Sequence, residues 1–223
     1  MNTQARQLAH FETARERGIP PQADGATPFR MRAVNQGARC FAFAGQKIKH
    51  AVDPCNVLHS GVARRAFGAI GDINLLLTRE SVADSDLLVI AGDNLFRESL
   101  AGFIDYAWKT EATVGVHHVT DGQAIKKYGV VTVDADGVIT HFEEKPKEPK
   151  SSLAAIALYF YSKKALPLFT TYIAAGNNPD QPGLFLQWLY PRKPVNTFQI
   201  TGQWLDIGSK ETLEEANRIF AER

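Results

Sequence analysis

The stretch Leu87-Leu88-Val89-Ile90-Ala91-Gly92-Asp93 decides the fold. Its first five residues are all apolar, and the run stops at a glycine that is followed by a carboxylate. A short, fully apolar run of this kind predicts a strand that is buried on both faces, as in a sheet covered by helices on each side. Residues 99–109 carry apolar side chains at helical spacing, so we predict an amphipathic helix after this strand.

The rest of the chain alternates between strand and helix patterns. Further strands are predicted at 113–119, 129–133, 138–142, 154–161 and 195–200. Further helices are predicted at 164–174, 183–189 and 209–222. Ser209 is the expected N-cap of the last helix, and Ala135-Asp136-Gly137 predicts the turn of a hairpin. Alternating strands and helices with one hairpin indicate an α/β layered fold whose sheet is mostly parallel.

Composition and charge divide the chain near Arg65. Residues 1–65 carry a net charge of +6 and few branched aliphatic side chains, whereas residues 66–223 carry −5 and hold most of them. Branched aliphatic residues make most of a hydrophobic core. We therefore expect residues 1–65 to be an atypical basic, poorly ordered segment and residues 66–223 to form the folded domain.

Properties of the whole chain exclude several classes of protein. Of its 223 residues, 44% are hydrophobic and 22% are charged, as in an ordinary globular domain. The net charge of +1 argues against a dedicated nucleic-acid binder, and the scattered arginines of residues 1–65 favour a flexible tail over a nucleic-acid arm. The two cysteines cannot form a disulfide framework, and no segment has the pattern of a zinc site, a membrane span or a signal peptide. We expect a soluble cytoplasmic protein and leave a homo-oligomer open.

Two aspartates have the setting of a metal ligand. Asp93 follows the buried strand beside Gly92, and ligands of α/β sheets bind beyond the carboxyl ends of such strands. Asp206 lies after the last predicted strand and before the last helix. Carboxylate oxygens are suitable ligands for Mg²⁺, so the two aspartates could share one ion. A helix N-cap is the alternative for Asp93.

A second polar cluster follows the predicted hairpin, at Glu143-Glu144-Lys145-Pro146. A lysine can bind phosphate as a point charge, and a glutamate such as Glu144 can accept hydrogen bonds from sugar hydroxyls. Gly129, at the start of the hairpin, would let a sugar lie against the backbone. A solvated surface charge is the common alternative for Lys145.

Six motifs occur in a fixed order along the chain. They are G-D-N-L-F from Gly92, K-Y-G-V-V from Lys127, F-E-E-K-P from Phe142, A-L-Y-F-Y from Ala157, G-N-N-P-D from Gly176 and W-L-D-I-G-S from Trp204. With this ordered set, the chain from about Gly68 to its end resembles the sugar-1-phosphate nucleotidyltransferases, in particular the glucose-1-phosphate thymidylyltransferase and uridylyltransferase group. The resemblance implies a Rossmann-like α/β domain with a mixed, mostly parallel sheet.

The resemblance also implies a reaction and its site. An NTP and a sugar 1-phosphate would give an NDP-sugar and pyrophosphate, with Mg²⁺ as the cofactor. Three kinds of site residue are implied: the catalytic metal ligands Asp93 and Asp206, the sugar and phosphate contacts Gly129, Glu144 and Lys145, and the nucleotide contacts Gly68 and Gly71.

The chain departs from the family pattern in two places. The family opens with a glycine-rich loop, roughly L-A-A-G-x-G-T-R, whose N–H groups hold the triphosphate, and no stretch of residues 1–65 fits it. We therefore expect the domain to lack its first βαβ portion, and a change of reading frame within residues 1–65 is one hypothesis for this. Ile156 stands where relatives show the threonine of V-T-G, so the sugar pocket is expected to differ. An inactive remnant, or a sugar-phosphate-binding pseudoenzyme, is the alternative function.

Overall fold

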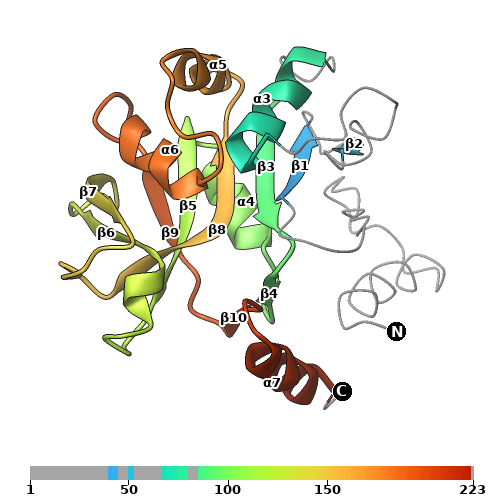
Figure 1. Ribbon diagram of the computed structural model, residues 1–223, viewed down its shortest axis with the longest axis vertical. Helices are drawn as coiled ribbons and strands as arrows, with labels where there is room; N and C mark the ends of the chain where they lie inside the picture. Colours follow the sequence, from blue (N-terminus) through green and yellow to red (C-terminus); the bar gives the residue numbers. More distant parts are fainter. Residues whose placement is uncertain (1–39, 45–49, 53–66, 80–84, 222–223) are drawn as a thin grey trace.

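A sheet covered by helices on both faces forms the centre of the computed structural model, which describes residues 40–44, 50–52, 67–79 and 85–221 (Figure 1). Its strands follow the order β2-β1-β3-β8-β5-β9, with β6 pairing with both β8 and β7. The strands are β1 (Cys40–Ala44), β2 (His50–Val52), β3 (Leu87–Ala91), β5 (Ala112–His118), β6 (Gly129–Val133), β7 (Ile139–Glu144), β8 (Leu153–Tyr161) and β9 (Asn196–Gln199). The predicted α/β class and the mixed sheet are confirmed.

The parallel share of the sheet is smaller than the sequence predicts. Among the described ladders only β5 with β9 is parallel, whereas β8 runs antiparallel to β3, β5 and β6. A parallel neighbour needs a long crossover connection, and β8 instead follows the β6–β7 hairpin through the short segment 145–152. Because β3 and β5 both oppose β8, they point the same way as β9. The carboxyl ends of these three strands therefore still lie at one edge of the sheet.

Two short strands, β4 (Asn94–Phe96) and β10 (Trp204–Asp206), form a separate antiparallel ribbon beyond this edge. Neither strand was predicted from the sequence. Their pairing sets Asn94 opposite Asp206 and Phe96 opposite Trp204. It joins the segment after β3 to a segment near the end of the chain.

Helices cover the two faces of the sheet unequally. The helices are α3 (Ala69–Arg79), α4 (Ala101–Ala107), α5 (Pro167–Ala174), α6 (Pro182–Leu189), α7 (Lys210–Ala221) and the 3₁₀ turn η1 (Ile125–Lys127). One core cluster combines the sheet with α3, α5 and α6, and a second combines it with α4. Within the described ranges, no helix has both the length and the apolar character needed to cross a bilayer.

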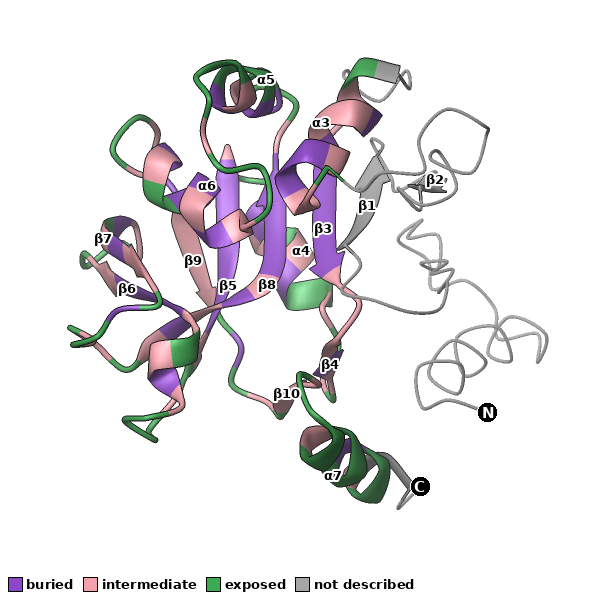
Figure 2. Cartoon of the chain, in the orientation of Figure 1, coloured by how far each residue is buried: buried purple, intermediate pink, exposed green. Residues whose placement is uncertain are grey.

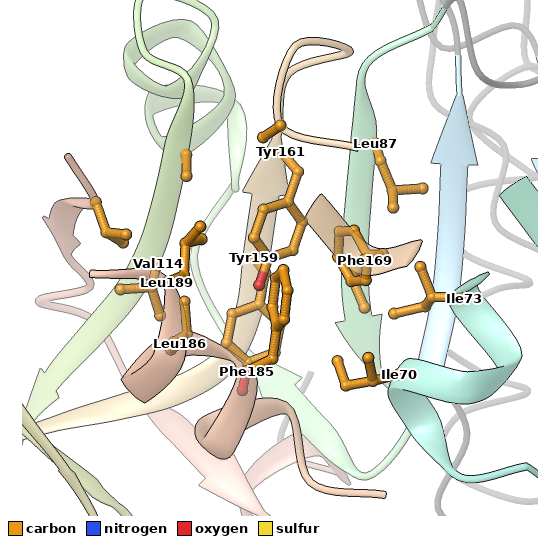
Figure 3. Packing of buried hydrophobic residues seen from close by; sticks show 14 of the residues in the cluster. Ile70, Ile73, Leu87, Val114, Tyr159, Tyr161, Phe169, Phe185, Leu186 and Leu189 are labelled. Carbon is orange, nitrogen blue, oxygen red and sulfur yellow. The ribbon is translucent and has the colours of Figure 1, made fainter. Parts of the chain in front are cut away.

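The central strands are buried on both faces, as predicted for β3 (Figure 2). On β8, Tyr159 and Tyr161 point into the cluster beneath α5 and α6, while Leu158 and Phe160 point into the cluster beneath α4. Figure 3 shows the first cluster, in which aromatic rings from β8, α5 and α6 meet. This aromatic layer packs against α6, the helix that contacts β7 of the hairpin.

Local turn chemistry agrees with the sequence at two places. Gly137 has φ +77° in the hairpin turn, and the Asp134 carboxylate accepts the N–H groups of Asp136 and Val138. Ser209 caps α7, because its hydroxyl accepts the N–H of Thr212 at 3.2 Å.

Of residues 1–65 only β1 and β2 are described, so the prediction of poor order falls mostly outside the described residues.

Candidate functional site

The structure brings Asp93 and Asp206 together at the carboxyl edge of the sheet. Asp93 lies between β3 and β4, and Asp206 ends β10. The N–H of Ile207 donates to the carbonyl oxygen of Asp93 at 2.8 Å. Burial raises the pKa of the Asp206 carboxyl, and the nearby charge of Asp93 raises it further. A strand follows Asp93, so the alternative that this residue caps a helix is wrong.

A chain of hydrogen bonds fixes the direction of the Asp93 carboxylate. The indole Nε1–H of Trp204 donates to Oδ1 of Asn94 at 2.6 Å. The amide Nδ2–H of Asn94 then donates to Oδ1 of Asp93 at 2.9 Å. Because the amide oxygen of Asn94 accepts the hydrogen bond from Trp204, the amide nitrogen of Asn94 faces the Asp93 carboxylate.

Tyr128 supports the other carboxylate. Its hydroxyl forms a hydrogen bond with Asp206, and its ring lies 5.3 Å from that of Trp204 in an edge-to-face arrangement. Burial, with Asp206 and Asp93 close by, raises the pKa of Tyr128 to about 12. The hydroxyl therefore keeps its proton at neutral pH and donates it to Asp206. Tyr128, Asn94 and Trp204 were not predicted as site residues, although each stands inside one of the six motifs.

The donor set at this edge fits Mg²⁺. Magnesium is usually held by one or two carboxylates, with water and substrate phosphates completing its coordination. Asp93 and Asp206 supply two carboxylates, and burial together with the nearby charge of Asp93 raises the pKa of Asp206. A divalent cation would relieve the repulsion between the two carboxylates. The described residues contain no group of three or more His, Cys, Asp or Glu side chains arranged for a metal.

Glu144 and Lys145 form a second cluster at the end of β7. Glu144 pairs with Gly129 across the hairpin, and its N–H donates to Oε1 of Gln187 in α6 at 3.1 Å. The side chain of Glu144 is 13% exposed and that of Lys145 is 53% exposed, with Nζ 3.9 Å from Oε1 of Glu144. Burial raises the pKa of the Glu144 carboxyl, and the Lys145 ammonium opposes this.

Tyr128 joins the two clusters. Its carbonyl oxygen accepts the N–H of Lys145 at 3.1 Å, while its side chain binds Asp206. Lys145 has φ +50°, a left-handed conformation that is uncommon for a residue other than glycine. Non-glycine residues held in this region concentrate at functional sites. The two clusters predicted separately from the sequence therefore share one residue in the fold.

Gly68 and Gly71 lie at the start of α3, beside the loop that contains Pro179 and Asp180. The N–H groups of Ile70 and Gly71 both donate to the carbonyl oxygen of Pro179, at 2.8 and 3.0 Å. Gly68 has φ +84°, and a Cβ there would lie 2.6 Å from Cα of Asp180. Close packing against this loop accounts for Gly68, and a Cβ at Gly71 would lie 2.8 Å from Cβ of Phe67. The contact of both glycines with a nucleotide stays a prediction.

Ile156 does not line the cluster around Glu144. It is 1% exposed and packs beneath α4, on the opposite face of β8 from α6. Ala155 and Ala157 pack against the cluster that contains α6. Successive side chains of a strand point to opposite faces, so Ile156 points away from the face that carries Glu144. Its effect on a sugar pocket stays a prediction.

Glu144→Gln is expected to raise the free energy of unfolding at pH 7 and to leave it nearly unchanged below about pH 4. Burial raises the folded-state pKa of Glu144 above its ordinary value of 4.5, so ionisation costs stability as the pH rises through the raised pKa. A neutral amide avoids this cost. Urea denaturation at pH 4 and pH 7 measures the difference, with the exposed Glu148→Gln as control. An equal effect of Glu144→Gln at both pH values would contradict the expectation.

The amino-acid sequence is similar to those of known proteins. The family described as "Nucleotidyl transferase" matches residues 56–223. The glucose-1-phosphate adenylyltransferase of Bacillus subtilis (strain 168) is 30% identical over 138 residues, which cover 59% of this chain and 36% of that protein. The bifunctional protein GlmU of Methanocaldococcus jannaschii is 27% identical over 148 residues, covering 66% and 35%. The chain thus spans about a third of the length of the curated relatives it matches.

Solved structures share the fold. A putative glucose-1-phosphate thymidylyltransferase from Bacillus anthracis, in complex with a sucrose, superposes with a TM-score of 0.60 at 23% identity, covering 80% of this chain and 74% of that one. A UDP-glucose pyrophosphorylase complexed with UDP-glucose superposes with a TM-score of 0.60 at 22% identity, covering 73% and 66%. These likenesses confirm the predicted Rossmann-like α/β fold.

Proposed function

Because this chain belongs to the nucleotidyl transferase family, we propose that it transfers a nucleotidyl group from an NTP to a sugar 1-phosphate and releases pyrophosphate. One observation carries the proposal: Tyr128 joins a pair of carboxylates to the Glu144–Lys145 cluster. The Asp93–Asp206 pair suits a cation that binds phosphates, and the Glu144–Lys145 cluster suits a phosphorylated sugar. A reaction that joins the phosphate of a sugar to the α-phosphate of a nucleotide needs both sites side by side.

The proposed chemistry is an in-line displacement. An oxygen of the sugar phosphate attacks the α-phosphorus of the NTP, and the bond from that phosphorus to the leaving pyrophosphate oxygen breaks. No covalent enzyme intermediate is needed, because the nucleophile is already an anion. The contribution of the protein is to hold two anions in a reactive geometry.

Each cluster has a separate role in this reaction. Lys145 would place its ammonium group against the sugar phosphate, and Glu144 would accept hydrogen bonds from the sugar hydroxyls. Asp93 and Asp206 would hold Mg²⁺, which neutralises phosphate charge when bound. Tyr128 keeps its hydroxyl proton directed at Asp206, and this hydrogen bond favours the ionised carboxylate.

A second candidate function is binding of sugar phosphate without turnover. The observation in its favour is that no stretch of residues 1–65 fits the glycine-rich triphosphate loop. Most of that segment lies outside the described residues. A protein of this kind would use Glu144 and Lys145 and would bind NTP poorly.

The test is direct assay of the purified chain. Release of pyrophosphate is measured with glucose 1-phosphate and each of ATP, UTP and dTTP in the presence of Mg²⁺. Calorimetry measures the binding of glucose 1-phosphate and of each NTP separately. Turnover together with binding of both ligands supports nucleotidyl transfer, and binding of glucose 1-phosphate alone supports the second candidate. If neither ligand binds, both proposals are wrong.

Lys145→Ala is expected to weaken the binding of glucose 1-phosphate and of inorganic phosphate by about 10- to 150-fold, since a hydrogen bond to a charged group contributes roughly 1.5–3 kcal/mol. Glu144→Ala should weaken the binding of glucose 1-phosphate by a similar factor and leave inorganic phosphate unaffected. Calorimetric titration of each variant measures both effects. The exposed neighbour Lys147 provides a matched control as Lys147→Ala. A silent Lys145→Ala variant would show that Lys145 is a solvated surface charge.

A further inference from the structure

Helix α6 touches Glu144 at two points that lie one helical turn apart. Oε1 of Gln187 accepts the N–H of Glu144 at 3.1 Å. Gly183, four residues earlier and so on the same face of the helix, lies against the carboxylate of Glu144. Figure 1 shows α6 beside β7, the strand that ends at Glu144. The first turn of α6 therefore forms a wall next to the carboxylate assigned to the sugar.

No side chain would fit at Gly183 without moving Glu144. A Cβ at Gly183 would lie 1.7 Å from Oε2 and 2.5 Å from Cδ of Glu144. The backbone of Gly183 is not in the left-handed region, and the residue is buried in the first turn of a helix. Alanine is favoured over glycine in helices. The glycine here is therefore explained by the space that Glu144 occupies, and not by backbone conformation.

The carboxylate is bounded by a second glycine. A Cβ at Gly129 would lie 3.0 Å from Oε2 of Glu144. The ion pair of Glu144 with Lys145 is long, at 3.9 Å, and Lys145 is 53% exposed. Such a pair restrains a carboxylate weakly. The confinement of the carboxylate between Gly183 of α6 and Gly129 of β6 therefore sets the direction of the Glu144 side chain.

We propose that Gly183 is a positioning residue of the sugar site. Its missing side chain lets the carboxylate of Glu144 lie against the first turn of α6, where it can accept hydrogen bonds from the sugar hydroxyls. A displacement of about 1 Å in a positioning group can cost about 100-fold in rate. The effect on turnover rests on the proposed nucleotidyl transfer, whereas the effect on the position of Glu144 does not.

Gly183→Ala is the test, with Gly102→Ala as its control. Gly102 is also a helical glycine, in α4, and a Cβ there would meet Cζ of Phe198 at an ordinary 3.5 Å. We expect Gly183→Ala to raise the KM for glucose 1-phosphate at least tenfold and to leave the KM for NTP unchanged. Gly102→Ala should alter neither. Equal kinetics in the two variants would overturn the inference.

The double variant Gly183→Ala/Glu144→Ala shows whether Gly183 acts through Glu144. If it does, adding Gly183→Ala to Glu144→Ala should cause no further loss, because the overlapping side chain is gone. If Gly183→Ala alone unfolds the protein, the double variant still tests the inference, because thermal melting should then show that the double variant is folded. A loss that persists in the Glu144→Ala background would overturn the inference.

An NMR measurement separates this inference from the proposed function. The carboxyl ¹³C signal of Glu144 is titrated in the unliganded wild type, in Gly183→Ala and in Gly102→Ala. Burial raises the pKa of Glu144, so displacing the carboxylate toward water should lower the pKa toward its ordinary value in Gly183→Ala alone. An unchanged pKa would overturn the inference. Absence of turnover in the wild type would overturn the proposed function and leave this result standing.

Discussion

Asp93→Asn and Asp206→Asn are each expected to slow nucleotidyl transfer by about 100- to 1000-fold, since losing one such electrostatic stabiliser costs about 2.7–4 kcal/mol. Asparagine has the size of aspartate but lacks its charge, so the fold should be kept while the site loses affinity for a cation. A cation bound between two partly buried carboxylates would offset their mutual repulsion. Pyrophosphate release at saturating NTP and glucose 1-phosphate measures the loss.

The double variant Asp93→Asn/Asp206→Asn should lose little more than either single variant. Residues that act as one unit show strongly non-additive effects on turnover. Asp105→Asn, which changes an exposed carboxylate on α4, provides the control and should keep wild-type turnover. Full activity in either single variant, or a multiplied loss in the double variant, would show that the two carboxylates do not share an ion.

Elements with a strong local pattern could be predicted from the sequence. The strand at Leu87–Ala91 and the strand at Gly129–Val133 were predicted to the residue. The first is a fully apolar run that ends at a glycine, and the second is bounded by a tyrosine–glycine pair and a turn. Helix α4 was predicted two residues too long at each end, and helix α5 three residues too long at its N-terminal end. Local patterns define the middle of a helix better than its ends.

Elements that depend on distant partners could not be predicted. Strands β4 and β10 have three residues each and exist as a pair whose members lie far apart in the chain. Helix α3 was not among the predicted helices, and the N–H groups of Ile70 and Gly71 in its first turn donate to the carbonyl oxygen of Pro179. The direction of β8 depends on its entry between β3 and β5. No local pattern carries that information.

The candidate site divides in the same way. Asp93 and Asp206 could be proposed from their motifs, but only the β4–β10 ribbon shows that they meet. Tyr128 stands in a quoted motif, yet its link to Asp206 depends on a fold that brings the start of the hairpin to the end of β10. The approach of Gly183 to Glu144 is likewise a property of packing. Sequence motifs identified the chemical groups, and tertiary contacts determine which of them act together.

The aromatic cluster beneath α5 and α6 is the support on which this site rests, and Phe185 is at its centre. Phe185 is fully buried, and its ring lies 4.3 Å from that of Phe169 (Figure 3). The ring of Tyr172 lies 5.2 Å from that of Phe185. Tyr161 of β8 lies 5.7 Å away, in an edge-to-face arrangement. Phe185 thus joins α6 both to α5 and to the sheet.

Phe185→Ala is expected to lower the free energy of unfolding by about 3–5 kcal/mol, because it removes a large buried ring and leaves a cavity that a close-packed layer cannot fill. Urea denaturation at pH 7 measures the loss, and Phe67→Ala provides the control. Phe67 is 46% exposed, so its truncation should change stability by about 0.5 kcal/mol or less. Since α6 also carries Gly183, Phe185→Ala should weaken the binding of glucose 1-phosphate even where the protein stays folded. A loss of stability no larger than that of Phe67→Ala would show that α6 does not depend on this cluster.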